Sequence, residues 1–401
     1  ADLQVFEGVT TYPAILTMKR GVAPKGHELR FWKVDALPDN NFLATWEAAA
    51  GPYPQTALGA GSWELENPAL RALRDKIKKG RKTLKEAYGS PLYGIKTGLN
   101  AAFVIDNATK ERLCAQDPKS ADLLKPFLEG KDLKRWRAEP RGLWLIYIPK
   151  NRINIDDYPA IRDWLLPFKD QLEKRATKQE WFELQQAQEA YLPYFEGAKV
   201  LYPEFCNVPQ FQLEDGHFTN NKCYFIGSDD AWLAAFLNSK VAWFTITGNS
   251  VPVRGGFHQM HSQFVEQAVI PKISAEQKTD LEGLTNSCQT AAQKRLALQT
   301  ALTRRLPDLC PPGREPKLTN KLKEWWTLPD FATFRAEVKK VFKADIPLTD
   351  RSDWEDWINR DRAEIARLTA EIAQAEAQID SIVYDLFDLT EDEIALLESV
   401  G

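Results

Sequence analysis

A heptad repeat near the C-terminus restricts the fold of this chain more than any other feature. Every seventh position is aliphatic, at Ile358, Ile365, Ile372, Ile379 and Leu386. The complementary positions hold Trp354, Leu368, Ala375 and Ile382. This period predicts a long helix from Asp353 with its apolar side chains in one seam. Water does not stabilise such a seam, so it must pack against another helix of this chain or of a second copy.

A second helical pattern supplies a candidate partner. Ser274 and Gln277 have capping-box spacing, and apolar residues follow at helical spacing until the segment 306–316, LPDLCPPGREP, ends the pattern. A short amphipathic helix is expected at 331–342. We favour an antiparallel hairpin of the helix at 275–306 with the heptad helix, and a dimerisation zipper stays open as the alternative.

Residues 92–273 show short β-rich runs separated by turns. The runs are LYGIKTG, AAFVID, LWLIYIP, KVLYPEF, QFQL, NKCYFIG and VIPKI. Helices are expected at 157–185 and 229–245, without the regular strand–helix alternation of a doubly wound sheet. The predicted fold class is therefore α+β: a mixed α/β domain followed by a helical, coiled-coil-like C-terminal region.

The N-terminal part is expected to connect this domain to something larger. A strand is predicted at 12–18, and a helix from Asn67 to Tyr88 with a basic outer face. The inner face of that helix is expected to hold Leu70, Leu73, Ile77 and Leu84. Because the chain begins at Ala1 inside a strand-like pattern, we expect a fragment or a processed product.

Charge is distributed unevenly, although the net charge is only −4. Residues 71–152 hold 20 Lys or Arg against 9 Asp or Glu, whereas residues 345–400 hold 4 Arg against 16 Asp or Glu. The first stretch favours an anionic partner and the second repels phosphate. Nucleic-acid contacts are therefore expected in the first two thirds of the chain only.

Several function classes are disfavoured by the sequence. It has no run of about 18 apolar residues for a membrane span, and its five widely separated cysteines indicate the reduced thiols of a cytoplasmic protein. The motifs GxGxxG, GxxxxGK[ST], HExxH and GxSxG do not occur. His258 and His261 lack a further ligand at the usual spacing, so no metal site is predicted, and no residue is assigned to catalysis.

Four polar, basic loops remain as candidates for binding: the first at 92–103, the second at 147–154, the third at 218–222 and the fourth at 249–261. They hold Lys96, Thr97 and Asn100; Lys150 and Arg152; Asn220, Asn221 and Lys222; and Arg254, His258 and Gln259. Side chains of these types match the hydrogen-bonding edges of bases, and Lys and Arg also neutralise phosphate. Phosphate contacts are expected from Arg71, Arg74, Lys78, Lys79, Lys82, Lys131, Lys134 and Arg135. Solvated turns have the same composition, so the loops alone leave DNA binding and a plain surface both open.

A resemblance along most of the chain favours DNA binding. It is carried, in order, by FEGVTTYPAILTMKRG (6–21), YGIKTGLNAAFVID (93–106), LLKPFLEGKDLKRW (123–136), KVLYPEF (199–205), TNNKCYFI (219–226), FLNSKVAWF (236–244), RGGF (254–257), VIPKI (269–273) and YDLFDLTEDEIALLE (384–398). The chain resembles the C-terminal part of type IIG restriction-modification enzymes and adenine-specific DNA methyltransferases, including their TaqI-like specificity domain. Large methyltransferases of BREX-type phage defence are similar.

The resemblance implies a division of the chain and a division of labour. Residues 1–66 would end a methyltransferase domain and its connector, 67–91 form a basic linker helix, 92–273 recognise the target and 274–401 form a helical spacer. The chain would read double-stranded DNA and hold no cofactor. An N-terminal catalytic domain absent from it would use S-adenosylmethionine to methylate adenine N6, with restriction as a possible further activity.

Two other interpretations stay open. In the first, the helical region recruits subunits of a defence complex and the basic surface binds DNA nonspecifically. In the second, paired acidic residues such as Asp156 and Asp157 serve a self-contained nuclease, whereas their positions at helix starts and turns are typical of caps.

Overall fold

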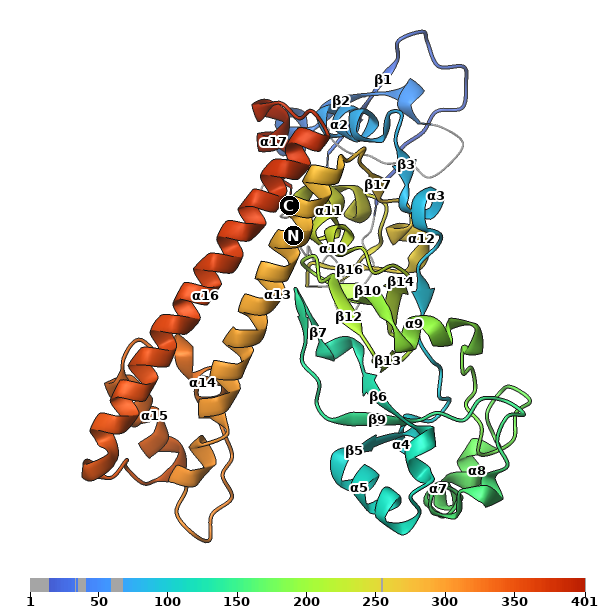
Figure 1. Ribbon diagram of the computed structural model, residues 1–401. Coiled ribbons are helices and arrows are strands. Elements are labelled where there is room, and N and C mark those ends of the chain that lie inside the picture. The colour runs from blue at the N-terminus through green and yellow to red at the C-terminus, as the bar shows by residue number, and fades with distance from the viewer. Residues whose placement is uncertain (1–13, 33, 35–40, 59–67, 254, 401) are drawn as a thin grey trace.

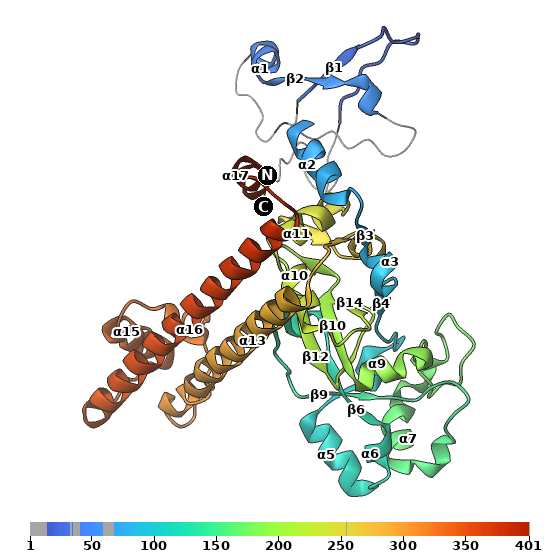
Figure 2. The ribbon, with the colours of Figure 1, turned by 45° about the horizontal axis from the view of Figure 1, so that its top comes forward.

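The computed structural model describes residues 14–32, 34, 41–58, 68–253 and 255–400. Figure 1 shows a central body from which two arms diverge, a mixed α/β lobe and a long helical hairpin. Figure 2 shows the same separation from a second direction, with the hairpin and α7 (Pro159–Leu165) of the lobe on opposite sides of the molecule. The expected fold class, a mixed α+β region followed by a helical one, is confirmed.

The body is built on a four-stranded antiparallel sheet in the order β12-β10-β14-β4. Its strands are β4 (Leu92–Tyr93), β10 (Ala198–Pro203), β12 (Gln212–Asp215) and β14 (Cys223–Ile226). Side chains alternate along β10, because Val200 and Tyr202 join the core of the body whereas Leu201 joins the core of the lobe. The sheet is therefore covered on both faces and lies between the two parts.

Two short helices replace the single helix expected at 229–245. They are α10 (Ala231–Leu237) and α11 (Lys240–Thr247). The chain turns between them at Asn238, whose side-chain amide donates to the carbonyl of Phe211 at 2.7 Å. Ser239 then caps α11 by accepting from the N–H of Ala242. These side-chain hydrogen bonds compete with continuation of one helix, so the expectation is wrong at this turn.

The rest of the body consists of short elements. They are the sheet of β11 (Phe205–Cys206), β16 (Phe257–Gln259) and β15 (Pro252–Val253), the helix α12 (Ser262–Val265), and β17 (Val269–Ile270) paired with β3 (Lys82–Thr83). The helix expected from Asn67 to Tyr88 is interrupted here. It forms α2 (Pro68–Lys78) and α3 (Leu84–Tyr88), because Gly80 has a φ of 68° and ends the first helix. The predicted inner face is confirmed, with Leu70, Leu73, Ile77 and Leu84 all buried.

The N-terminal segment adds the antiparallel pair β1 (Glu28–Phe31) and β2 (Gly51–Pro54) and the helix α1 (Phe42–Ala49). The strand expected at 12–18 is wrong in its described part, since residues 14–18 form no strand and Ile15 and Met18 are exposed. An apolar run becomes a strand only where another strand pairs its backbone, and no described strand does so here. Asn67 and residues 12–13 lie outside the described residues.

The lobe contains a four-stranded sheet in the order β13-β6-β9-β5, in which only the β13–β6 pair is parallel. Its strands are β5 (Val104–Asp106), β6 (Leu124–Leu128), β9 (Leu143–Ile146) and β13 (Phe218–Thr219), and β7 (Leu133–Lys134) pairs with β8 (Arg137–Ala138) beside it. Its further helices are α4 (Asn100–Phe103), α5 (Asn107–Gln116), α6 (Ser120–Leu123), α8 (Lys169–Leu172) and α9 (Leu192–Glu196). The helix expected at 157–185 is wrong after Leu172, where irregular chain follows as far as 188.

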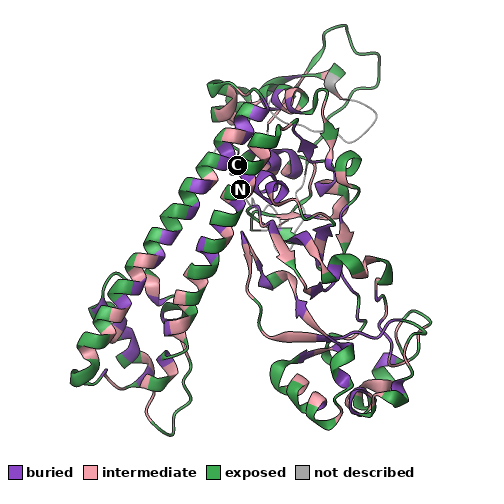
Figure 3. Ribbon diagram, in the orientation of Figure 1, coloured by how far each residue is buried: buried purple, intermediate pink, exposed green. Residues whose placement is uncertain are grey.

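The hairpin is formed by α13 (Ala275–Thr303) and α16 (Arg351–Leu386), with α14 (Asn320–Lys323) and α15 (Phe331–Phe342) at its far end. The predicted capping box of Ser274 with Gln277 is confirmed. Figure 3 shows buried positions recurring along both long helices, and Ile358, Ile365 and Ile372 of the heptad seam are among them. The intramolecular hairpin is thus the arrangement found.

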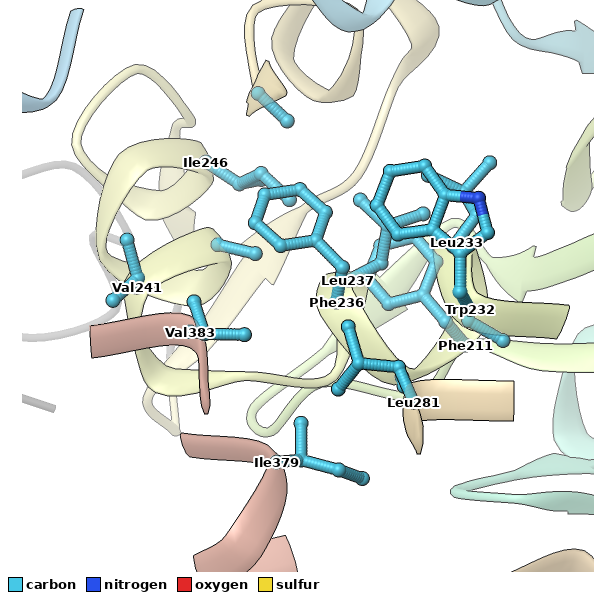
Figure 4. Close-up of a cluster of buried hydrophobic side chains, with 14 of the residues drawn as sticks. Phe211, Trp232, Leu233, Phe236, Leu237, Val241, Ile246, Leu281, Ile379 and Val383 are labelled. Atoms are coloured by element: carbon cyan, nitrogen blue, oxygen red, sulfur yellow. The ribbon is translucent and has the colours of Figure 1, made fainter. Parts of the chain in front are cut away.

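The near end of the hairpin is packed into the body. Figure 4 shows Leu281 of α13 and Ile379 and Val383 of α16 beside Trp232 and Phe236 of α10. All five side chains belong to one buried cluster, and α17 (Glu391–Glu398) closes its edge. The hairpin is therefore anchored by apolar burial rather than by a surface contact.

Candidate nucleic-acid interface

The first and third candidate loops are joined by their backbones. The N–H of Ile95 donates to the carbonyl of Thr219 at 2.7 Å, and the N–H of Asn221 donates back to Ile95 at 3.0 Å. Gly94 permits this approach, because a Cβ there would overlap the carbonyl oxygens of Thr219 and Asn220. Two loops separated by more than a hundred residues therefore form one surface.

The second loop is connected to the first through the segment 183–186. Gln186 and Lys96 exchange two backbone hydrogen bonds of 2.9 and 3.1 Å. The N–H of Asn151, a residue with a φ of 55°, donates to Glu183 Oε1 at 2.6 Å. Glu183 is almost fully buried, so it holds the turn of the second loop from within.

Arg175 also stabilises the contact between the first loop and the segment 183–186. Its guanidinium donates to the carbonyls of Thr97 at 2.9 Å, Glu183 at 2.8 Å and Trp181 at 2.9 Å, and its Nε donates to Leu172 at 2.9 Å. Burial lowers the pKa of this guanidinium from its ordinary value. Because these carbonyls are satisfied by a side chain, the segment after Leu172 needs no helical hydrogen bonds, which explains why the expected helix ends there.

Glu204 joins the third loop to the fourth. Lys222 Nζ lies 2.7 Å from Glu204 Oε2, and His261 Nε2 lies 3.1 Å from Glu204 Oε1. The backbone carbonyl of Glu204 also accepts from the N–H of Met260 at 2.7 Å. All four predicted loops are thus brought together along one line, which we call the four-loop seam: residues 94–100, 148–152, 219–222 and 257–261, held by Arg175, Glu183 and Glu204.

Within the seam, the predicted base-contacting side chains are not equally available. Lys96 and Asn100 are exposed, and Asn100 accepts a hydrogen bond of 2.6 Å from Thr97. Thr97 and Asn220 are buried, and Asn220 Oδ1 accepts from the N–H of Lys222, so both shape the loops. Asn221 is half-buried.

Three of the remaining base-contact candidates already have intramolecular partners. Lys150 Nζ donates to the carbonyl of Lys178 at 2.7 Å, and Arg152 Nε lies 2.9 Å from Glu189 Oε2. His258 Nδ1 lies 2.7 Å from Ser250 Oγ, and burial lowers the pKa of its imidazole. Gln259 is half-buried in β16, and Arg254 lies outside the described residues. If Lys150 or Arg152 binds a ligand, its side chain must therefore give up its contact with Lys178 or Glu189.

The predicted phosphate-contacting residues divide in a similar way. Lys78, Lys79 and Lys82 are exposed beside the body, and Lys131 is exposed 3.3 Å from Glu129. Arg71 donates to Tyr53 Oη at 3.2 Å, the Arg74 guanidinium lies 3.8 Å from the ring centroid of Phe244, and Lys134 is half-buried.

Arg135, a predicted phosphate contact, also has two intramolecular partners. Its Nε lies 2.5 Å from Glu376 Oε1, and its Nη2 donates to the carbonyl of Asn238 at 3.1 Å. It therefore connects the lobe to the hairpin and to the body.

Sequence reasoning missed the three residues that hold the seam together. Arg175 and Glu183 lie where the apolar spacing predicted a continuous helix, and Glu204 lies in a β-rich run. A buried charge among turn residues is visible only when its partners are known. The polar segment TKQE (177–180) was the available sign that the helix ends early.

Replacing Gly94 by alanine is expected to separate the first and third loops. The new Cβ would meet backbone carbonyls, which have no freedom to rotate away, so we expect a loss of about 1–3 kcal/mol in unfolding free energy. Chemical denaturation measures this loss. Gly51→Ala is the control, because Gly51 has open space around its Cβ and, like Gly94, no left-handed φ. Equal losses in both variants would contradict the close approach at Gly94.

Neither a metal centre nor a membrane segment is found in the described ranges. No three His, Cys, Asp or Glu side chains gather there in a way that could hold a metal ion. No helix there is both long and apolar enough to cross a membrane. Burial raises the pKa of the Cys206 thiol to about 12, so this cysteine stays protonated at neutral pH.

The sequence is similar to that of a known methyltransferase. The chain is 25% identical over 285 residues to the type II methyltransferase M.PaeR7I of Pseudomonas aeruginosa, which covers 66% of this chain and 48% of that protein. The chain is similar to a restriction-modification methyltransferase. It spans about half the length of that relative. Residues 274–383, which include α13 and most of α16, match a family described as a domain of unknown function, DUF8810.

A solved structure also aligns with the chain. It is that of the type IIL restriction-modification enzyme MmeI in complex with DNA, with a TM-score of 0.43 and 14% identity, covering 87% of this chain and 42% of that chain.

Proposed function

We propose that this chain is the target-recognition part of a cytoplasmic restriction-modification methyltransferase. It binds double-stranded DNA, reads its sequence through the four-loop seam, and directs adenine-N6 methylation by a catalytic domain that uses S-adenosylmethionine. In this proposal residues 92–273 act as a TaqI-like specificity domain. Related roles in restriction or in BREX-type defence belong to the same proposal.

The convergence of the four loops is the observation that carries the proposal. Four segments whose side chains suit base edges lie far apart in the sequence, yet backbone hydrogen bonds and the carboxylates of Glu183 and Glu204 connect each of them to the next. Proteins that recognise a DNA sequence need base-contacting side chains on connected loops, because these side chains distinguish bases only when a rigid scaffold positions them. The similarity to a type II methyltransferase supports the same assignment.

Selection from a pool of random duplexes tests the proposal. We expect the chain to enrich one short site and to bind it about 10³-fold or more tightly than unrelated duplex at the same salt concentration. Sequence-independent binding with a steep salt dependence would contradict recognition and favour an interaction module with nonspecific DNA affinity. Magnesium-dependent cleavage by this chain alone would instead indicate a nuclease.

Lys96→Ala is expected to relax one position of the selected site. Lys96 is exposed at the centre of the seam, and loss of a base contact costs about 1–3 kcal/mol for the preferred base. Lys79→Ala, at the exposed residue directly after α2, is expected to weaken binding to all sequences about equally. Repeating the selection with both variants distinguishes the roles, and an equal loss on every sequence for Lys96→Ala would rule out base reading by this residue.

A further inference from the structure

The far end of the hairpin has a hydrophobic core of its own, separate from those of the body and the lobe. Leu322, Trp325, Phe334 and Ile346 are fully buried in it, and Ile358 of α16 joins them. The indole N–H of Trp325 donates to the carbonyl of Gln299 at 3.2 Å, which ties this core to the end of α13. The tip is therefore a small folded unit on the end of the arm.

The segment of the tip that joins the two long helices differs in charge from the residues that follow it. Residues 304–343 hold ten Lys or Arg against five Asp or Glu, whereas residues 345–400 hold 4 Arg against 16 Asp or Glu. The expectation of DNA contacts in the first two thirds only rests on residues 345–400, and residues 304–343 differ from them in the sign of their net charge. The excess of cations lies on α14, α15 and the loops beside them, whereas the start of α16, which also packs into the tip core, is acidic.

Tertiary contacts gather the cations of the tip. The Arg314 guanidinium donates to the carbonyl of Phe342 at 3.1 Å, which places the loop before α14 against the end of α15. Thr319 Oγ1 donates to Glu337 Oε1 at 3.0 Å and joins the start of α14 to α15. The exposed lysines of these two helices and of the residue that follows α15, which we call the tip patch, are Lys321, Lys323, Lys339, Lys340 and Lys343.

Most of the tip patch is not neutralised within the protein. Lys340 lies 3.6 Å from Glu337, but Lys321, Lys323, Lys339 and Lys343 have no ion pair within the described part of the chain. Glu337 itself is buried and shared with Thr319. Four free ammonium groups spread over the exposed surface of a folded scaffold favour a polyanion over a single small anion, since an extended ligand can neutralise several of them at once.

The length of the arm fits a duplex held at the body. A helix of 29 residues such as α13 measures about 43 Å at about 1.5 Å per residue. One turn of duplex measures about 34–36 Å, so the span of the arm from its base to its tip is comparable to one turn. The tip thus suits contact with DNA outside the sequence that the loops read.

We propose that the tip patch binds the phosphate backbone of double-stranded DNA, independently of sequence, about one helical turn from the site read by the four-loop seam. This inference rests on the proposed DNA-binding function. It gives the region matched by the domain of unknown function a role as a nonspecific clamp on the duplex.

The test compares two variants of the whole chain with four charges removed from each. The tip variant carries Lys321→Gln, Lys323→Gln, Lys339→Gln and Lys343→Gln. The control carries Lys19→Gln, Lys25→Gln, Lys272→Gln and Lys294→Gln, which are exposed lysines outside the tip and the seam. Thermal unfolding checks that both variants fold, and affinity is measured on duplexes of about 12 and about 30 base pairs over a series of salt concentrations.

On the longer duplex, the tip variant is expected to bind at least about tenfold more weakly than the wild type. The slope of log affinity against log salt concentration is expected to become shallower by about one for each phosphate that is no longer neutralised. The control is expected to change little, and the difference between tip variant and wild type is expected to vanish on the shorter duplex. Equal affinity and slope for wild type and tip variant on the longer duplex would overturn the proposal.

Failure of the clamp and failure of sequence reading have different signatures. If the wild type selects no site but the tip variant still loses affinity on long duplexes, backbone binding by the tip patch is supported and sequence recognition by the four-loop seam is contradicted. If the wild type selects a site and the tip variant is unchanged, recognition stands and the clamp falls. If the wild type binds no duplex, or if the tip binds only an acidic protein, the clamp is wrong.

Discussion

Lys199→Met is expected to destabilise the chain by about 3–5 kcal/mol, because it leaves a buried carboxylate without its partner. Lys199 is fully buried on β10, and its Nζ lies 3.0 Å from Oε2 of the nearly buried Glu214, which stands opposite it on β12. Its ammonium also faces the carbonyls of Phe195 at 3.4 Å and Gly197 at 3.3 Å. Urea denaturation at pH 8 measures the loss.

The double variant Lys199→Met with Glu214→Leu is the matched control. Replacing both charges by apolar groups of similar size removes the uncompensated carboxylate, so most of the lost stability should return. If the double variant is as unstable as Lys199→Met alone, the loss comes from packing and not from the ion pair.

The same site predicts how stability depends on pH. The hydrogen bond that His217 Nδ1 donates to the Glu214 carboxylate raises the pKa of His217, while burial and the charge of Lys199 act in the opposite direction. Because the folded pKa lies above the unfolded value of about 6.5, His217 stabilises the fold fully below that pH and loses its contribution as pH rises through the folded pKa.

In Lys199→Met the effect of pH should be larger than in the wild type. His217 is then the remaining cation at Glu214, and its pKa rises further once the charge of Lys199 is gone. Unfolding measured between pH 6 and pH 9 should show stability falling more steeply in the variant. A flat profile in the variant would show that His217 does not compensate Glu214.

Arg175→Met is expected to be the most damaging single change to DNA recognition. It removes four short hydrogen bonds to backbone carbonyls of Thr97, Trp181, Glu183 and Leu172, and bonds to a charged donor contribute about 1.5–3 kcal/mol each when isolated. Because the guanidinium is half-buried and the carbonyls gain water when released, we expect a net loss of about 2–4 kcal/mol in unfolding free energy.

The functional consequence should be a loss of selectivity rather than of all binding. The first and second loops depend on Arg175 for their position, whereas the exposed Lys78 and Lys79 at the end of α2 and just after it do not. Duplex selection should therefore give a weaker sequence preference at nearly unchanged nonspecific affinity. Arg162→Met is the control, since Arg162 pairs with the exposed Asp156 and Asp163 on the surface of the lobe. An unchanged site in Arg175→Met would refute its positioning role.

The sequence by itself determined the elements whose hydrogen bonds are local. The hairpin helices follow from the apolar spacing of the seam, and the capping box of Ser274 follows from two residues three positions apart. The helix α15 has the expected bounds, Phe331–Phe342. Each of these signals lies within a few residues of the structure that it predicts, because a helix satisfies its backbone within its own turns.

Only the tertiary structure decided which polar residues face solvent and which hold the fold. Arg135 and Lys79 are both cations in a basic stretch, yet one is paired with Glu376 from the far end of the chain and the other is exposed. Arg175 and Glu204 join loops that the sequence keeps apart, and the tip patch gathers lysines within a region that is acidic on average. The free energy of a charge depends on its burial and its partners, and long-range packing sets both.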